Sequence, residues 1–362
     1  MALRMSQQDN RPHVDRDDLR WCHESVQGVS RTFALTVDVL DEPMSSYICL
    51  GYLVCRIADT VEDAAHIPPA DQADILRTYD AVLDPESDTD ATAFVTAVEP
   101  HLPDEDAMTD DWAVVHDAPR VIGTFQDLPA DVQGAIVPPA RELVSGMAEF
   151  VERYDDDGGL RIQTRGELEE YCYYAAGTVG NLITNLVTRH EVSADRSRQL
   201  YDTAEEFGLL LQLVNISKDV YDDYTAEDNV YLPAEWLREE GVPQDGVIDD
   251  AHESGAASVV RRTAEFAGSF LDDAQTYLET VPLRDGNTLA AWAIPFLLAV
   301  GTLRELLTRP EDALSSTGVK ISRQEVLAVV AEMHGGGSRE SLDELRREIT
   351  AGPYHRAASS LD

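Results

Sequence analysis

A polar face on an otherwise apolar helix is the feature that most constrains the fold of this chain. Residues 207–214 are mostly apolar and run directly into the polar and acidic residues 215–223. Side chains three or four residues apart share one face of a helix. Here that face carries an orderly series: Gly208, Gln212, Asn215, Asp219 and Asp223. Burying such groups without partners costs several kcal/mol. We therefore expect this face to line a polar cavity inside a helical protein.

A second acidic cluster precedes it in the chain. Asp59, Glu62 and Asp63 end a segment with apolar residues at positions 54, 57, 58 and 61. Carboxylates at this spacing repel one another, whereas Mg²⁺ takes oxygen ligands and bridges to substrate phosphates. A single acidic cluster among 68 acidic residues is most often a solvated face. Because both clusters end apolar helices, we predict that they face each other and hold Mg²⁺ for a diphosphate.

Cationic and hydroxyl side chains accompany both clusters. Arg56 stands three residues before Asp59, and Lys218 immediately precedes Asp219. Cations beside metal-binding acids suit an anion that is first held and then lost as a leaving group. Structural ion pairing is an equally good explanation for Arg56, and for Arg31 as well. It is a weaker one for Lys218, since lysine is almost absent elsewhere in the chain.

The charge balance is strongly acidic. The 68 acidic and 28 basic residues give a net charge of −40, which argues against a nucleic-acid partner because phosphate binding needs basic surface. Only Lys218 and Lys320 are lysines, so 28 − 2 = 26 of the basic residues are arginine. The acids are spread over the whole chain, which favours adaptation to concentrated salt over an acidic tail.

The cysteines and apolar segments point to a cytoplasmic protein without a transmembrane anchor. Cys22, Cys49, Cys55 and Cys172 show no metal-ligand spacing, which favours reduced, buried thiols. The N-terminus has no apolar signal-peptide segment. The most apolar stretch, residues 289–303, is shorter than a membrane span and ends at Arg304.

Helical periodicity extends along the chain, and no strand-like alternation of any length stands out. We expect long helices over residues 17–40, 164–189 and 195–224. The predicted fold class is all-α, a single large helical bundle that encloses a central cavity. Residues 1–16 are expected to be disordered, residues 17–333 to form the domain, and residues 334–362 to be a polar C-terminal extension.

Five segments together resemble the squalene/phytoene synthase family. They are residues 30–33, 52–63, 147–150, 171–180 and 215–223, and the resemblance runs in order from about residue 20 to 330. It implies the isoprenoid synthase fold and a transferase that joins two prenyl diphosphates head to head. The squalene-forming members condense two farnesyl diphosphates with Mg²⁺ to presqualene diphosphate, which NADPH then reduces.

The resemblance also implies a role for each matching residue. The implied metal ligands are Asp59, Glu62, Asp63, Asp219 and Asp223, of which all but Glu62 are also counted as catalytic. Tyr171 is the implied proton-handling residue. The implied substrate and cofactor contacts are Ser30, Arg31, Phe33, Tyr52, Arg56, Gln212, Asn215, Lys218 and Lys320. The implied partners are prenyl diphosphates, with transient membrane contact for product release.

Three segments depart from the family pattern. Ser322 stands where a basic residue is usual, two positions after Lys320. The loop at residues 224–229 is acidic where an arginine is usual, and residues 230–233 look more like the phytoene-forming members. A phytoene or dehydrosqualene synthase, which needs no NADPH, is therefore the nearest alternative. A non-catalytic helical protein of the same fold is a more distant one.

Overall fold

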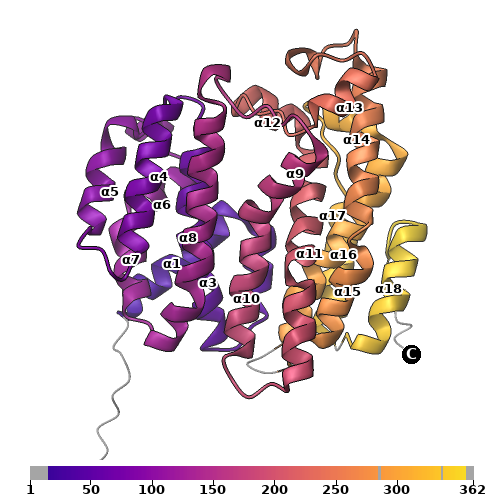
Figure 1. The fold of residues 1–362 in the computed structure, drawn as a ribbon. Coiled ribbons are helices and arrows are strands. Elements are labelled where there is room, and N and C mark those ends of the chain that lie inside the picture. Colours follow the sequence, from indigo (N-terminus) through magenta and orange to yellow (C-terminus); the bar gives the residue numbers. More distant parts are fainter. Residues whose placement is uncertain (1–14, 284–286, 336, 356–362) are drawn as a thin grey trace, which may run out of the picture.

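The computed structural model describes residues 15–283, 287–335 and 337–355, and in these residues the chain is all-α as predicted (Figure 1). An isolated parallel β bridge pairs Arg161 with Val230. Most of the predicted disordered segment lies outside the described residues. Asp15 and Arg16 are described, and they cap and begin the first helix.

The first half of the chain forms helices α1 (Arg16–Val29), α2 (Arg31–Asp38), α3 (Met44–Glu62), α4 (Pro69–Leu83), α5 (Ala91–Val98), α6 (Asp110–His116), α7 (Ala118–Gln126), α8 (Ala130–Arg153), α9 (Arg165–Cys172) and α10 (Thr178–Thr188). The second half forms α11 (Ala194–Lys218), α12 (Val220–Ala226), α13 (Ala234–Glu239), α14 (Glu253–Gly268), α15 (Leu271–Thr280), α16 (Thr288–Thr308), α17 (Arg323–His334) and α18 (Arg339–Ala351). Short 3₁₀ turns are η1 (Glu99–His101), η2 (Glu105–Ala107), η3 (Asp155–Asp157), η5 (Gln244–Gly246) and η6 (Pro310–Leu314).

The long helices run roughly parallel and form one bundle (Figure 1). α4 packs on α8, α10 lies against both α8 and α11, and α11 packs in turn on α14, α15 and α16. α9 and α12 lie at one end of the bundle, the upper end in Figure 1. The first acidic cluster ends α3, and the second lies where α11 meets α12, so both clusters belong to the same body.

Two of the predicted long helices are interrupted. Ser30 has extended backbone angles, and its hydroxyl accepts the N–H of Phe33, so it ends α1 and caps α2. Asp219 leaves the helical conformation at φ −104° and ψ 13°, which separates α11 from α12. The prediction of one continuous helix over residues 195–224 was wrong at this point. The chain turns inside the acidic motif.

Residues 165–188 do continue as one helical rod, but a π-helical turn, η4 (Tyr173–Gly177), lies between α9 and α10. Two glycines explain the packing here. A Cβ on Gly208 would lie 2.2 Å from the carbonyl oxygen of Ala176, and one on Gly180 would lie 2.1 Å from that of Ala204. Only glycine allows backbones to approach this closely. These contacts hold α11 against η4 and α10.

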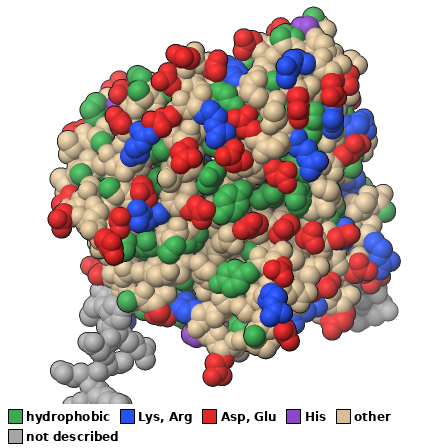
Figure 2. All heavy atoms as spheres, viewed as in Figure 1, with side chains coloured by type: hydrophobic (Ala, Val, Ile, Leu, Met, Phe, Trp, Pro, Cys, Tyr) green, Lys and Arg blue, Asp and Glu red, His purple; other side chains and the backbone are tan. Residues whose placement is uncertain are grey.

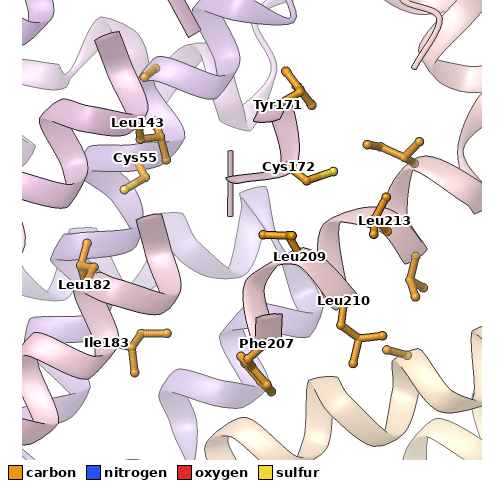
Figure 3. Close-up of a cluster of buried hydrophobic side chains, with 14 of the residues drawn as sticks. Cys55, Leu143, Tyr171, Cys172, Leu182, Ile183, Phe207, Leu209, Leu210 and Leu213 are labelled. Carbon is orange, nitrogen blue, oxygen red and sulfur yellow. The ribbon is translucent and has the colours of Figure 1, made fainter. Parts of the chain in front are cut away.

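The core is continuous from the first helices to the last. Figure 3 shows a part of it where side chains of α3, α8, α10 and α11 converge, among them Cys55, Leu143, Leu182 and Leu209. All four cysteines are free and buried. Such packing is typical of a single hydrophobic core.

α16 is the most apolar helix of this core. With 21 residues and a mean hydropathy of 1.4, it is long and apolar enough to cross a membrane, by length and composition only. The expectation that this segment is too short was wrong, since the helix runs from Thr288 to Thr308. In this structure 72% of the apolar window is buried inside the protein, and α2, α11, α14 and α18 pack around it.

The predicted C-terminal extension contains a helix that packs on the bundle. The Leu342, Leu345 and Ile349 side chains of α18 are buried, and α18 lies against α16. Nearby, Arg304 of α16 donates to both carboxylate oxygens of Glu325 on α17, at 2.8 and 2.9 Å. A buried pair of this kind joins the last helices to the bundle in one geometry.

The acidic residues lie over the whole of the face seen in Figure 2, and the basic side chains are scattered among them. Many arginines on the surface pair with carboxylates one helical turn away or on a neighbouring helix, such as Arg309 with Glu305 and Asp312.

Candidate active site

The two acidic clusters meet at one cavity. α3 ends at Glu62 with Asp63 as its C-cap, while α12 carries Asp223 in its first turn. The cavity contains about 540 Å³ of empty space, part of it open to solvent. The predicted site residues in its lining are Arg56, Asp59, Glu62, Asp63, Tyr171, Gln212, Asn215 and Asp223. Lining residues outside the predicted site set are Met147, Ala175, Ile216, Glu227 and Tyr231.

The carboxyl groups of the cavity are strongly perturbed. Burial, together with repulsion from neighbouring carboxylates, raises the pKa of Asp59 to about 7, that of Glu227 to about 8 and that of Asp223 to about 9. Burial and the adjacent Asp63 also raise the pKa of Glu62 well above its ordinary value. Each negative charge here is costly until a cation neutralises it. The cavity is therefore built to receive positive charge.

Two side-chain cations flank the cavity, and each has a carboxylate partner. The Arg56 Nε donates to Asp111 at 2.8 Å, and its Nη1 lies 3.9 Å from an oxygen of Asp59. The Lys218 Nζ pairs with the carboxylate of Asp219. Structural ion pairing, the alternative explanation for Arg56, thus describes its contact with Asp111. Both cations are partly buried; Arg56 lines the cavity, whereas Lys218 and Asp219 are not among its lining residues.

Mg²⁺ suits the donors of this cavity, because they are carboxylate oxygens in excess over cations. The raised pKa values of Asp59, Asp223 and Glu227 show the same excess of negative charge. Within the described part of the chain, however, no three His, Cys, Asp or Glu side chains converge closely enough to enclose a metal ion. The acids face the cavity from α3 on one side and from α12 on the other.

Tyr171 lies at the inner wall. It stands one residue before the end of α9, is 3% exposed, and directs its hydroxyl toward Glu62 at 3.4 Å. The apolar cluster of Figure 3 begins beside it, where Cys172, Leu209 and Leu213 are buried. The cavity thus has a polar mouth and an apolar neighbour in the core.

The residues predicted near the start of the chain form a separate group. Phe33 stacks on Tyr52 with ring centroids 4.0 Å apart, and burial raises the pKa of Tyr52 to about 12. Ser30 caps α2. The side chain of Arg31 lies outside what the structure describes. Tyr52 lies one turn before Arg56 on α3, which places this group beside the cavity without lining it.

The predicted cofactor segment is also outside the cavity lining. Lys320 is exposed in the connection between η6 and α17. Ser322, the departure from the family pattern, is the N-cap of α17, and its hydroxyl accepts the N–H of Glu325 at 3.1 Å. Serine is one of the preferred residues at a helix N-cap. This accounts for Ser322 without a cofactor.

Sequence reasoning missed three polar residues of the site. Asp111 on α6 pairs with Arg56, but no spacing links these two positions in the sequence. Glu227 and Tyr231 follow α12 and turn back into the cavity. In the sequence, these two residues lie in segments that depart from the family pattern, the acidic loop at 224–229 and residues 230–233. Nothing in the sequence placed those segments at the site.

Residues 26–325 match the Squalene/phytoene synthase family. A squalene synthase of Botryococcus braunii is 27% identical over 301 residues, which cover 82% of this chain and 60% of that protein. Human squalene synthase is 25% identical over 296 residues, which cover 81% of this chain and 65% of the human protein. The chain thus spans about two thirds or less of the length of these relatives.

Solved structures show the same fold. A structure of TcSQS with the ligand E5700 superposes with a TM-score of 0.72 at 22% identity, covering 93% of this chain and 98% of that one. A dehydrosqualene synthase in complex with ligand gives a TM-score of 0.62 at 20% identity, covering 88% and 96% of the two chains. The helical bundle is the isoprenoid synthase fold. Because the match to the family extends over most of the described residues, this chain belongs to the squalene/phytoene synthase family.

Proposed function

We propose that this protein is a squalene synthase, a transferase that condenses two farnesyl diphosphates to presqualene diphosphate with Mg²⁺ and reduces that intermediate with NADPH. The observation that carries the proposal is the shared cavity, in which carboxylates of α3 and α12 face each other above the buried hydroxyl of Tyr171. The named relatives support the choice of substrate class.

In this proposal, Asp59, Glu62, Asp63, Asp219 and Asp223 would hold Mg²⁺, which would supply the positive charge that a departing diphosphate needs. Arg56 and Lys218 would bind the diphosphate oxygens, exchanging part of their carboxylate contacts for phosphate. Asn215 and Gln212, one and two turns before Asp219, would supply amide hydrogen bonds. These groups orient the anion and hold it during ionisation.

Deeper in the cavity, the side chains would contact the prenyl chains of the substrate and handle a proton. The prenyl chains would lie along the apolar side of the cavity, past Met147, Ala175 and Ile216 toward the cluster in Figure 3. That wall excludes water from the cationic stage of the reaction. Tyr171, at the boundary between the polar mouth and this wall, would hold or accept the proton lost on joining the chains.

A phytoene or dehydrosqualene synthase is the second candidate, and specific observations favour it. Ser322 is used as a helix cap, and Lys320 and Ser322, the residues of the predicted cofactor segment, are not among the lining residues of the cavity. Such an enzyme would share the Mg²⁺ chemistry, end by proton loss and make no use of NADPH.

Product analysis distinguishes the two. The protein is incubated in concentrated salt with farnesyl or geranylgeranyl diphosphate and Mg²⁺, with and without NADPH. We expect squalene only when farnesyl diphosphate and NADPH are both present. A C40 triene formed without cofactor would establish the second candidate instead. No product from the folded protein with either substrate would indicate a non-catalytic member of the family.

A matched pair of variants tests the site. Asp223→Asn removes a cavity carboxylate, and we expect it to reduce turnover by at least about 100-fold. Asp222→Asn changes the neighbouring exposed carboxylate in the same motif, which does not line the cavity, and should stay within about twofold of wild type. Equal activity of the two variants would contradict the assignment.

A further inference from the structure

Tyr231 is the lining residue that the proposed function leaves without a role. It is 6% exposed, and its ring lies beside that of Tyr171 with centroids 4.8 Å apart. The two hydroxyl oxygens are 3.1 Å apart. A buried hydroxyl needs a hydrogen-bond partner, and here the two phenols are partners of each other at the inner wall of a polar cavity. The pair therefore does more than fill space in the core.

Asn229 fixes the orientation of the second phenol. The side-chain oxygen of Asn229 accepts the N–H of Leu160 at 2.8 Å, and an N–H can only donate. The amide nitrogen of Asn229 must therefore be the atom that faces Tyr231, at 3.1 Å. Since this nitrogen is also only a donor, the Tyr231 oxygen accepts there. The same oxygen accepts the Tyr171 hydroxyl, at 3.1 Å.

Glu62 offers the Tyr171 hydroxyl a second, longer contact. The hydroxyl has one proton, and the nearest carboxylate oxygen of Glu62 lies 3.4 Å from it, whereas the Tyr231 oxygen lies at 3.1 Å. The Tyr231 oxygen therefore receives two donors, the Asn229 amide and the Tyr171 hydroxyl, and the shorter contact sets the direction of the Tyr171 proton.

The segment that carries Asn229 and Tyr231 is firmly held. Residues 230 and 234 pair through their main chain with residues 160 and 162, and the N–H of Asn229 donates to the carbonyl of Asp223 at 3.0 Å. Arg161, 8% exposed, adds hydrogen bonds to the carbonyl and carboxylate of Asp228. A pairing of this kind keeps a side chain in one rotamer, as positioned catalytic groups require. The acidic loop is thus the anchor of the Asn229–Tyr231 pair.

We propose that Tyr231, oriented by Asn229, is a positioning residue for Tyr171. Its oxygen accepts the Tyr171 hydroxyl and holds that hydroxyl in one orientation at the inner wall of the cavity. This inference rests on the proposed function, in which Tyr171 handles the proton of the condensation. The segment at residues 230–233 thereby acquires a mechanistic purpose in this chain.

The test is Tyr231→Phe, which keeps the ring contact and removes only the hydroxyl. We expect the kcat of the first condensation to fall about 10- to 100-fold, within the range that a positioned proton-transfer group contributes. The KM for farnesyl diphosphate and the Kd for the unreactive farnesyl thiodiphosphate with Mg²⁺ should stay within about twofold, since Tyr231 contacts neither predicted phosphate ligand. Tyr224→Phe is the matched control, because the Tyr224 hydroxyl donates to the carbonyl of Asp245 and the residue does not line the cavity.

Wild-type kcat in Tyr231→Phe would overturn the inference, as would a rise in KM and Kd that matches the fall in kcat. If the wild-type protein forms the condensation product and Tyr231→Phe forms it equally fast, the proposed function stands without this role for Tyr231. If wild-type protein forms no product, the proposed function fails and this inference fails with it.

Discussion

Replacing Glu227 by glutamine should stabilise the metal-free protein. The Glu227 side chain lies among the carboxylates of the cavity, and burial raises its pKa from 4.5 to about 8. At pH 7 the folded state must therefore keep a proton that the unfolded chain has lost. The difference of 2.5 units between pH 7 and the ordinary pKa corresponds to roughly 3 kcal/mol. Because the side chain is partly accessible to solvent, we expect a gain of about 1–3 kcal/mol in the free energy of unfolding for Glu227→Gln.

The pH dependence has a definite sign. Between pH 4.5 and about 8 the folded state binds more protons than the unfolded state, so the unfolding free energy of wild type falls as pH rises through this window. Glutamine does not titrate, and the variant loses this part of the slope. The gain should be near zero at pH 4 and largest at pH 8.

Urea unfolding in concentrated salt with EDTA, followed by circular dichroism at pH 4, 6 and 8, measures this gain. Glu24→Gln, which changes an exposed carboxylate on α1, is the control and should alter stability by less than about 0.5 kcal/mol at each pH. Adding Mg²⁺ with a diphosphate should shrink the gain, because a cation supplies wild type with the missing counter-charge. A Glu227→Gln variant that is less stable than wild type, or a gain that does not depend on pH, would refute the reasoning.

Three further predictions concern other parts of the molecule. In dilute buffer the protein should lose helical circular dichroism, because its net charge of −40 is no longer screened, and full helicity there would contradict salt adaptation. Gly208→Ala should destabilise the fold by about 1–3 kcal/mol in urea unfolding, since its Cβ would meet a backbone carbonyl, whereas Gly134→Ala, with open space around it, should stabilise by about 0.5–1 kcal/mol. Lys320→Ala should slow the NADPH-dependent step and spare the first condensation, and equal loss in both assays would remove Lys320 from the cofactor site.

Much of the fold could be predicted from local pattern. Apolar residues at helical spacing indicated the all-α class, and the absence of strand alternation agrees with a described chain whose regular elements are all helices. Local pattern did not predict the break at Asp219, because every residue from 215 to 223 is compatible with a helix. The N–H of Asn229 donates to the carbonyl of Asp223 at the end of this motif, and such a contact beyond the helix cannot be inferred from helical periodicity.

The site residues likewise fall into those that local sequence pattern identifies and those that it does not. Four lining residues could be identified from the sequence: Asp59, Glu62, Asp63 and Asp223. Acidic residues at four-residue spacing on an apolar helix predict a helix face that lines a polar cavity. Asp111, Glu227 and Tyr231 could not be identified from the sequence, since they reach the cavity only after distant segments pack together.

The sequence by itself determined the helical class, the acidic surface and the two carboxylate clusters, because periodicity and charge are local properties of a chain. Only the tertiary structure decided that the clusters share one cavity, that the Lys218 amine pairs with Asp219, and that Gly208 admits the carbonyl of Ala176. It also decided that the acidic loop at 224–229 anchors a second phenol beside Tyr171. These are distances between residues far apart in the chain, and they exist only once the core has brought the helices together.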